Sequence, residues 1–434
     1  MTDPGKTEVG SVFVSNYPPY SFWSSDQVPK ALKALNSPPL PDTRIGLYLH
    51  IPFCRKRCKF CYFRVYTDKN SDEIQTYLNA LAQEVSLYGA LPSVRGRKLT
   101  FVYFGGGTPS YISAVHLRDL AQTLKEAIPW DGAEEITFEC EPGTLTEAKL
   151  DAIREIGVTR LSLGIENFDD RILEENGRAH HSKEILRSIP WIRERKFEQL
   201  NIDLIAGMIG ETWDTWRDSV QRTIDLDPES VTVYQMELPY NTVFSNDLLH
   251  GTLEQPVADW EIKRAWQEYS FERLAEAGYE ISSAYTMVKK NKRCDFVYRN
   301  AVWHGSDMIG TGVASFGHMS GVHFQNTAAW DRYLQAVENG RLPLDRAFVT
   351  SRRERLTREM ILQLKLGKIH AEYFQRKFTT NILEEFATLY GDLQRDGFLE
   401  YDSHGVRLTT RGLLQVDHLL PEFYDQQYRN ARYT

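Results

Sequence analysis

The chain has 434 residues, of which 42% are hydrophobic and 25% are charged, and its formal net charge is −8. This composition is ordinary for a folded globular protein with one large and one smaller domain. The acidic balance argues against nucleic acid as a partner, and no stretch approaches the roughly 18 uninterrupted apolar residues of a membrane span. The N-terminal segment lacks a basic start before an apolar run, so we expect no signal peptide and a cytoplasmic protein.

Residues 1–40 are predicted to form an N-terminal arm. Within them, Val12–Ser25 (VFVSNYPPYSFWSS) is aromatic and proline-rich, which is typical of a segment that packs in an extended conformation. Its aromatic side chains suit a flat apolar ligand and ordinary core packing equally well. The arm therefore does not select a substrate.

Residues 41–342 alternate short β-rich runs with amphipathic segments, which predicts βαβ units and a parallel sheet. The runs are Ile45–His50, Leu99–Phe104, Glu135–Cys140, Thr159–Gly164, Leu200–Gly207 and Val231–Leu238. Helices are expected at Asp72–Leu91, Val115–Ala127 and Leu145–Ile156. Such repeats favour an α/β fold with a partial (β/α)6 barrel of the TIM type, and an open doubly wound sheet is the alternative. Both architectures place functional groups at the carboxyl ends of the strands.

Residues 343–434 differ in pattern and are predicted to form a winged-helix-like C-terminal domain. Ser351–Leu366 is a charged amphipathic helix, and Asn381–Asp396 is followed by a strand, a turn, a second strand and a helix. Modules of this kind often bind DNA, but this one is not notably basic. A structural or substrate-covering role is therefore favoured over DNA binding.

Three of the five cysteines, Cys54, Cys58 and Cys61, fall within eight residues. Thiolates at such spacing select an iron–sulfur cluster or zinc, and a disulfide framework would spread an even set of cysteines along the chain. Structural zinc requires four ligands, and His50 is the only nearby candidate for the fourth. Three ligands on a four-iron cluster would leave one iron free for a substrate. Cys140 and Cys294 are expected to be plain buried thiols.

The segment from Tyr48 to Cys61, YLHIPFCRKRCKFC, resembles the radical S-adenosylmethionine (SAM) enzymes, and specifically their oxygen-independent coproporphyrinogen III oxidase-like (HemN-like) branch. The resemblance covers almost the whole chain. It implies a radical SAM barrel whose three cysteines hold a [4Fe-4S] cluster with SAM on the free iron. It also implies one-electron cleavage of SAM to methionine and a 5′-deoxyadenosyl radical, which removes a hydrogen atom from the substrate.

The same resemblance assigns SAM-contacting roles to residues at later strand ends. The GGGTPS loop, which includes Gly105, Gly106, Gly107 and Thr108, resembles the family loop that receives the methionine amino group, and a phosphate-binding turn is the alternative. The matching motifs imply further contacts from Tyr48, Glu139, Arg178 and Asp203. A salt-bridge network at the barrel mouth is the alternative for the charged residues, and Tyr48 at a strand end also suits the core.

A second glycine-bearing segment, Ile309–Gly317 (IGTGVASFG), resembles a family element that lines a space for a second SAM molecule or the substrate. Gly310 and Gly312 are the residues expected to bind there. A strand and turn packed against the barrel is the alternative, and the sequence leaves the two open.

Two departures separate the chain from authentic coproporphyrinogen oxidases. Phe63 stands where those enzymes carry a fourth cysteine, and Glu166 replaces the usual glutamine after the fourth strand. A carboxylate at position 166 adds about one negative charge, which favours a cationic sulfonium and disfavours a tetra-acid substrate. Tyr48, Glu139 and Glu166 are the candidate catalytic residues.

Three functions remain open at this point. The departures favour a class C-type radical SAM methyl or methylene transferase that uses two SAM molecules. The alternatives are an oxygen-independent coproporphyrinogen III oxidase and a haem chaperone, although the chaperone branch normally lacks an arm such as Val12–Ser25. The expected partners are a small substrate, aromatic or tetrapyrrole, and an electron donor such as flavodoxin or ferredoxin.

Overall fold

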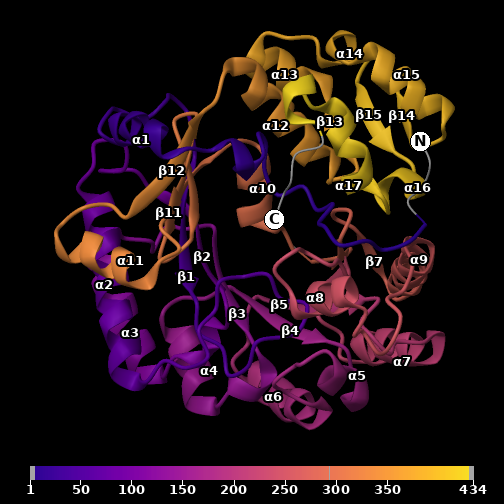
Figure 1. Cartoon of the computed structure of the whole chain (residues 1–434), viewed down its shortest axis with the longest axis horizontal. Helices are drawn as coiled ribbons and strands as arrows, with labels where there is room; N and C mark the ends of the chain where they lie inside the picture. Colours follow the sequence, from indigo (N-terminus) through magenta and orange to yellow (C-terminus); the bar gives the residue numbers. More distant parts are fainter. Residues whose placement is uncertain (1–4, 293, 430–434) are drawn as a thin grey trace.

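The computed structural model describes residues 5–292 and 294–429, so the extreme ends of the predicted arm (1–4) and of the C-terminal domain (430–434) lie outside the described residues. Its centre is a run of six parallel strands that pair in sequence order (Figure 1). These strands are β1 (Ile45–Ile51), β2 (Leu99–Gly106), β3 (Glu135–Cys140), β4 (Arg160–Glu166), β5 (Gln199–Ala206) and β6 (Ser230–Gln235). All six predicted runs are confirmed to within a few residues.

The helices between these strands cover the outer face of the sheet, as the lower half of Figure 1 shows. They are α2 (Ser71–Gly89), α3 (Ala114–Ala127), α4 (Glu147–Glu155), α5 (Asp170–Glu175), α6 (Ser182–Glu194) and α7 (Trp213–Asp225). Their starts are fixed locally: Asn70 accepts hydrogen bonds from the backbone of Asp72 and Glu73 at the start of α2, and Thr212 does the same for α7. Because the strand order contains no reversal, the doubly wound alternative is wrong and the partial (β/α)6 barrel is confirmed.

Both edges of this barrel are extended by further strands, of which the sequence suggested only the one at Ile309–Gly317, as an alternative. Beyond β1 lie β9 (Asp307–Thr311), β10 (Phe316–Met319), β11 (Val322–Asn326) and β12 (Leu344–Val349), and beyond β6 lie β8 (Thr286–Lys289) and β7 (Tyr279–Ile281). The associated helices are α8 (Val243–His250), α9 (Trp260–Glu276), α10 (Val297–Trp303) and α11 (Trp330–Glu338). Strand β9 runs parallel to β1, whereas the outer strands are antiparallel. Most of these outer strands are short, so they contain too few residues for an alternating hydrophobic pattern to be recognised.

The C-terminal region forms the separate yellow body at the top right of Figure 1. It consists of α12 (Arg352–Leu364), β13 (Lys368–His370), α13 (Ala371–Phe378), α14 (Ile382–Glu385), α15 (Ala387–Arg395), β14 (Leu399–Tyr401), β15 (Gly405–Leu408), α16 (Thr410–Leu413) and α17 (Val416–Leu419). Its three strands form one small antiparallel sheet in the order β13-β15-β14. The helices and the strand–turn–strand follow the winged-helix-like pattern expected from the sequence.

The N-terminal arm crosses between the barrel and the C-terminal domain before it forms α1 (Val28–Leu35), and the indigo trace in Figure 1 follows this path. Val14 and Tyr17 are fully buried there. The backbone N–H of Val14 donates to Asp417 at 2.8 Å, and Ser24 exchanges backbone hydrogen bonds with Ala347. The arm is thus part of the folded core. Short 3-10 helices complete the description at Tyr20–Phe22, Ser25–Gln27, Pro109–Tyr111, Pro142–Thr144, Leu420–Phe423 and Gln426–Tyr428.

Apolar side chains from the barrel, the arm and the C-terminal domain belong to one continuous core. Among the described residues, no helix is both long enough and apolar enough to cross a membrane.

Candidate active site at the strand ends

The three clustered cysteines lie on the loop that follows β1. Cys54 is buried, with 9% of its surface exposed, whereas Cys58 and Cys61 are half-buried. The loop is tied back on itself, because the N–H of Cys54 donates to the carbonyl of Tyr66 at 3.0 Å and the N–H of Tyr66 donates to Pro52 at 2.7 Å. The thiols are therefore held at the carboxyl end of β1, where the sequence analysis placed them.

Two neighbouring side chains donate hydrogen bonds to these sulfurs. The hydroxyl of Thr108 donates to the Sγ of Cys54 at 3.3 Å, and the guanidinium of Arg178 donates to the Sγ of Cys58 at 3.4 Å. Burial raises the pKa of Cys54 to about 11 and that of Cys61 to about 12. Both thiols therefore keep their protons at neutral pH unless a metal displaces them.

The glycine loop after β2 lies directly against the cysteine loop. A Cβ on Gly107 would be 3.1 Å from the Sγ of Cys54 and 2.9 Å from the backbone of Pro52. A Cβ on Gly106, whose φ is +117°, would be 2.6 Å from a ring nitrogen of His50. Only glycine allows this close approach of the two loops. The predicted GGGTPS loop and the predicted thiols are thus brought together.

Glu139 on β3 faces the same glycine loop. One of its carboxylate oxygens accepts from the hydroxyl of Tyr103 at 2.6 Å, and the other accepts from the backbone N–H of Gly106 at 3.1 Å. Burial and the negative charge of Asp203 raise the pKa of Glu139 to about 7, although the two hydrogen bonds oppose this shift. Tyr103 was not singled out from the sequence, although strict alternation along β2 puts it on the same face as Gly105.

Glu166 at the end of β4 forms an ion pair with Arg178 at 3.5 Å, and Arg178 also donates to the carbonyl of Gly164 at 2.8 Å. The backbone of Glu166 has a φ of +67°, a left-handed conformation that is costly for a residue with a side chain. Burial raises the pKa of Glu166 to about 7, although the charge of Arg178 opposes this shift. Strain of this kind is often retained at functional sites.

Asp203 on β5 completes the group of carboxylates. It accepts hydrogen bonds from the hydroxyl of Ser162 and the amide of Asn201, both at 2.8 Å. Burial raises its pKa as well. The charges of Glu139 and Asp203 both act on Glu166, and Asp203 also acts on Glu139; Arg178 offsets the charge of Glu166, whereas Arg160 offsets that of Asp203. A pocket with this surplus of negative charge favours a cationic ligand.

A second ion-pair network beside the cysteine loop was missed from the sequence. Glu141, two residues after Glu139, contacts Arg55 at 3.0 Å and the ring of His180 at 3.1 Å. Burial would raise the pKa of Glu141, but His180, Arg55 and Arg178 together lower it to about 2. The network fixes the cysteine loop to the ends of β3 and β4. Only the tertiary fold brings these residues together, so no local signal could have revealed it.

The second glycine segment lies on the other side of β1. Gly310 pairs with Tyr48 in the β1–β9 ladder, and a Cβ on it would be only 1.8 Å from the carbonyl oxygen of Phe316. A Cβ on Gly312 would be 2.5 Å from the hydroxyl of Tyr77. Both positions are filled by close packing, which matches the strand-and-turn alternative. Their role in binding a second SAM molecule stays a prediction.

Tyr48 itself is half-buried and stacks on Tyr103, with ring centroids 5.8 Å apart. Its hydroxyl lies 3.3 Å from a ring nitrogen of His50. Phe63, at the position of the missing fourth cysteine, is 46% exposed and packs against Tyr62. Among residues 5–292 and 294–429, no three His, Cys, Asp or Glu side chains converge as ligands of a single metal ion.

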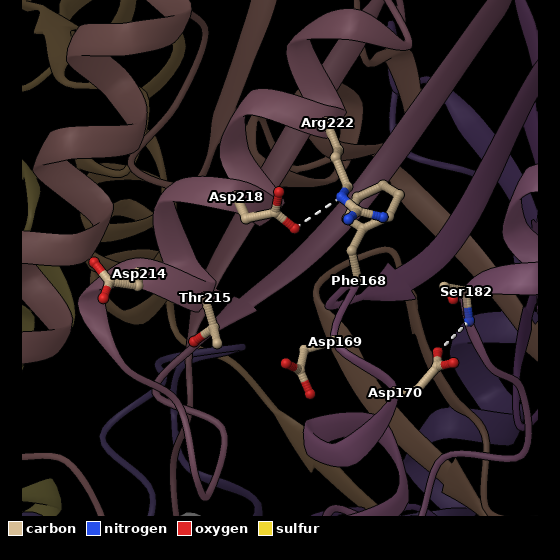
Figure 2. A pocket seen from close by; sticks show the side chains of 8 residues that line it. All are labelled: Phe168, Asp169, Asp170, Ser182, Asp214, Thr215, Asp218 and Arg222. Carbon is tan, nitrogen blue, oxygen red and sulfur yellow. Dashed lines mark hydrogen bonds and ion pairs between the residues drawn. The ribbon is translucent and has the colours of Figure 1, made fainter.

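A hollow with a volume of about 420 Å³ lies elsewhere, beside α5 and α7 (Figure 2). Four aspartates and one arginine line it together with Phe168, Ser182 and Thr215, and the ion pair between Arg222 and Asp218 closes one wall. None of the predicted site residues lies in it. This open, charged hollow is therefore not part of the thiol site.

Comparisons with known proteins agree with the barrel fold and with the site around the clustered cysteines. The family model described as the radical SAM superfamily matches residues 48–223, and the HemN C-terminal domain matches residues 350–414. Residues 48–223 therefore carry the sequence pattern of the radical SAM superfamily, and residues 350–414 carry that of the HemN C-terminal domain. The family implies a [4Fe-4S] cluster and SAM, and the buried sulfur donors with their Thr108 and Arg178 hydrogen bonds fit such a cluster.

Curated relatives carry two different names. The chain is 28% identical over 381 residues to a heme chaperone HemW from Bacillus subtilis, which covers 87% of this chain and 98% of the relative. It is 25% identical over 430 residues to an oxygen-independent coproporphyrinogen III oxidase from Synechocystis, which covers 94% and 91%. The solved coproporphyrinogen III oxidase (HemN) from Escherichia coli shares the fold, with a TM-score of 0.82 and 22% identity over 95% of this chain and 96% of that chain. These relatives give no support to a methyltransferase.

Proposed function

We propose that this chain is a radical SAM enzyme that binds SAM at the ends of β1–β5 and uses it to start a radical reaction on a tetrapyrrole-type substrate. The observation that carries the proposal is the meeting of two cysteine thiols with the glycine loop and the carboxylates. Thr108 and Arg178 contact the sulfurs, and Gly106 bonds to Glu139. A cluster with bound SAM would supply a primary carbon radical by one-electron cleavage of the sulfonium.

Cys54, Cys58 and Cys61 are proposed to hold the cluster. The N–H donors of Arg178 and the hydroxyl of Thr108 would stabilise negative charge on the sulfurs, since hydrogen bonds to thiolates tune such clusters. A Cβ at Gly107 would press on the Sγ of Cys54, so glycine at this position keeps the backbone of the loop close to the thiols. This backbone is proposed to bind the amino group of methionine.

The three carboxylates are proposed to bind the remainder of SAM. Glu139, Glu166 and Asp203 combine into a negatively charged pocket that suits the sulfonium, the amino group and the ribose hydroxyls. Arg178 is held by Gly164 and Glu166, so its guanidinium remains beside Cys58, where a methionine carboxylate could pair with it. Burial of these groups excludes water from a reactive radical.

The names of the relatives support a tetrapyrrole as the substrate class. An oxidative decarboxylation of the coproporphyrinogen type is the first activity to test, because a relative of that name matches 94% of the chain. Haem binding without turnover is the second candidate, supported by the chaperone relative that is matched over 98% of its own length. The buried arm with Val14 and Tyr17 favours the enzyme, since the chaperone branch normally lacks such an arm.

The test is anaerobic turnover of the reconstituted protein with dithionite, SAM and coproporphyrinogen III. The expected result is 5′-deoxyadenosine together with a decarboxylated porphyrinogen, both identified by mass spectrometry. Stoichiometric haem binding with no decarboxylation would favour the chaperone instead. Release of S-adenosylhomocysteine with a methylated product would contradict decarboxylation and would support the methyltransferase hypothesis.

A further inference from the structure

One face of the antiparallel strands β10, β11 and β12 is turned toward the N-terminal arm. Cross-strand pairing places Phe316, Gln325 and Arg346 in one row on this face. Tyr20 of the arm packs on Phe316, with ring centroids 4.3 Å apart, and its carbonyl accepts a hydrogen bond from Arg346 at 2.9 Å. The arm at Tyr20 therefore lies against this row of side chains.

Arg358 on α12 reaches the same stretch of the arm from the C-terminal domain. Its Nε donates to the side-chain oxygen of Asn16 at 2.6 Å, and one of its Nη atoms donates to the carbonyl of Val302 at 3.3 Å. Burial raises the pKa of Tyr20, and the positive charges of Arg358 and Arg346 oppose this rise. Two guanidinium groups from different elements thus converge on one half-buried tyrosine.

Neither of these two arginines has a carboxylate of the protein as its partner. In the part of the chain that the structure describes, residues 5–292 and 294–429, no ion pair involves either guanidinium. Glu359, the acidic residue next to Arg358, already binds Lys377 at 2.8 Å. Asp345 is exposed and lies 3.7 Å from Arg332. The nearby acids therefore leave the two charges uncompensated.

Burial makes these two charges costly. It lowers the pKa of Arg346 and of Arg358, and Arg358 is only 4% exposed. Burial, and after it positive charge that includes Arg358, also lowers the pKa of the neighbouring His318 and His323 well below the usual range. Both imidazole rings are therefore neutral at physiological pH. A buried positive charge that no carboxylate offsets favours an external anion.

Another pair of buried arginines, Arg160 and Arg299, differs in this respect. Arg160 lowers the pKa of both Glu135 and Asp203 against the effect of burial. Burial lowers the pKa of Arg299 to about 9, and Glu135 opposes this shift. These two arginines offset acids of the protein itself, so they need no ligand.

Tyr20 faces a hollow that the cysteine loop also borders. Tyr62 on that loop and Tyr234 on β6 are each 41% exposed, yet burial raises the pKa of both. This combination is expected of side chains that line a hollow, where protein surrounds an open space. The charge of Tyr20 raises the pKa of Tyr62 and that of Tyr298 on α10. The arm, α10 and the cysteine loop therefore border one space.

We propose that Arg346 and Arg358, which converge on Tyr20 of the arm, form a subsite that binds a carboxylate side chain of the substrate. The inference rests on the proposed function and adds that the tetrapyrrole carries acidic side chains. A guanidinium suits a carboxylate because its N–H donors match the two oxygens. The subsite belongs to the arm, β12 and α12, whereas the carboxylates proposed to bind SAM lie at the ends of β3–β5. The anion and the cation would thus be bound by different elements.

The test titrates the full, reconstituted protein with coproporphyrin III and with its tetramethyl ester, which keeps the ring and lacks the carboxylates. Both titrations use the same detergent solution, and the absorbance of the porphyrin gives each Kd. The variants are Arg346→Gln and Arg358→Gln, and Arg346→Lys tests rescue by a positive charge. The matched control is Arg332→Gln, which removes the same charge from an exposed position on α11.

We expect Arg346→Gln and Arg358→Gln each to weaken binding of coproporphyrin III by about tenfold or more, and Arg346→Lys to recover part of the loss. The ester should bind the wild type and these variants equally. Arg332→Gln should bind both ligands as the wild type does. Arg346 is half-buried, so its variants decide the question if Arg358→Gln does not fold.

Two results would overturn the subsite. One is an unchanged Kd for coproporphyrin III in Arg346→Gln. The other is an equal loss of affinity for the acid and the ester, which would indicate general damage to the hollow. A wild type that forms no 5′-deoxyadenosine from SAM and dithionite would instead defeat the proposed function, while the porphyrin titrations would still decide the subsite.

Discussion

Two glycine segments of this protein are built alike and differ in what surrounds them. Gly106 donates its backbone N–H to Glu139 at 3.1 Å, and Gly312 donates its own to Glu84 at 2.8 Å. Glu84 is buried and Glu139 is half-buried, and desolvation raises the pKa of each to about 7. Both glycines lie where a side chain would clash. Judged only by these features, either segment could be the ligand site.

Their neighbours distinguish the two. Glu84 also accepts from the amide of Asn326 at 2.6 Å and the hydroxyl of Tyr333 at 2.7 Å, so its carboxylate is saturated by groups of the protein. Glu139 has a second carboxylate, Asp203, beside it, and that charge raises its pKa further. A saturated carboxylate stabilises the fold, whereas neighbouring carboxylates that repel one another favour an external cation.

The largest expected effect tests whether the cysteine loop beside Gly106 holds a cluster. Cys58→Ser should abolish cluster incorporation and SAM cleavage, because two thiols cannot retain the cluster and serine is a poor ligand for soft iron–sulfur chemistry. Iron and sulfide analysis of reconstituted protein measures this. Cys294→Ser, at a buried cysteine far from the loop in sequence, is the control and should keep its full iron content.

A substitution that removes the anchor of Gly312 should lower the stability of the fold and should not affect SAM binding. Glu84→Ala leaves the N–H of Gly312 and the hydroxyl of Tyr333 without an acceptor, and we expect a loss of about 3 kcal/mol in the free energy of unfolding. Urea denaturation of the apoprotein measures it. If Glu84→Ala unfolded like the wild type but bound SAM poorly, the structural assignment of this segment would be wrong.

The matched substitution on the other side is Glu139→Gln. It keeps the shape and removes a buried charge, so stability should change little while SAM affinity falls by about 10- to 100-fold. Equilibrium binding of SAM to the reconstituted protein provides the measurement. If Glu139→Gln instead lost stability but bound SAM as tightly as the wild type, Glu139 would have the same structural role as Glu84.

The pH dependence of SAM binding sharpens the same difference. Glu139 and Glu166 have pKa values of about 7, so both are largely protonated and neutral below that pH. A cationic sulfonium favours their charged forms, and affinity should therefore rise by about tenfold between pH 6 and 8. Glu139→Gln should flatten this rise. A fall in affinity with rising pH would contradict the carboxylate role.

The smallest expected effect concerns Glu166, where the resemblance leads us to expect glutamine. Glu166→Gln should weaken SAM binding by only about threefold. The effect is small because Arg178 loses only part of its counter-charge in this variant. The same change should improve binding of a carboxylate-rich tetrapyrrole. Titrations of the variant with SAM and with coproporphyrin III measure the two effects separately, and weaker binding of that tetra-acid would count against the charge argument.

The sequence predicted most of the barrel and the thiol site because their signals are local. Cys54, Cys58 and Cys61 lie within eight residues, and each central strand is an apolar run between recognisable helices. The anchoring of Gly312 was not predictable, because Glu84 lies 228 residues away on α2. The same holds for the network of Glu141 with Arg55 and His180, which only the closed fold brings together.

The most direct test of the central claim is SAM cleavage by the anaerobically reconstituted protein with dithionite and without substrate. The account predicts 5′-deoxyadenosine and methionine in equal amounts, and neither product from Cys58→Ser. A protein with a full complement of iron and sulfide that reduces normally yet forms no 5′-deoxyadenosine would contradict it.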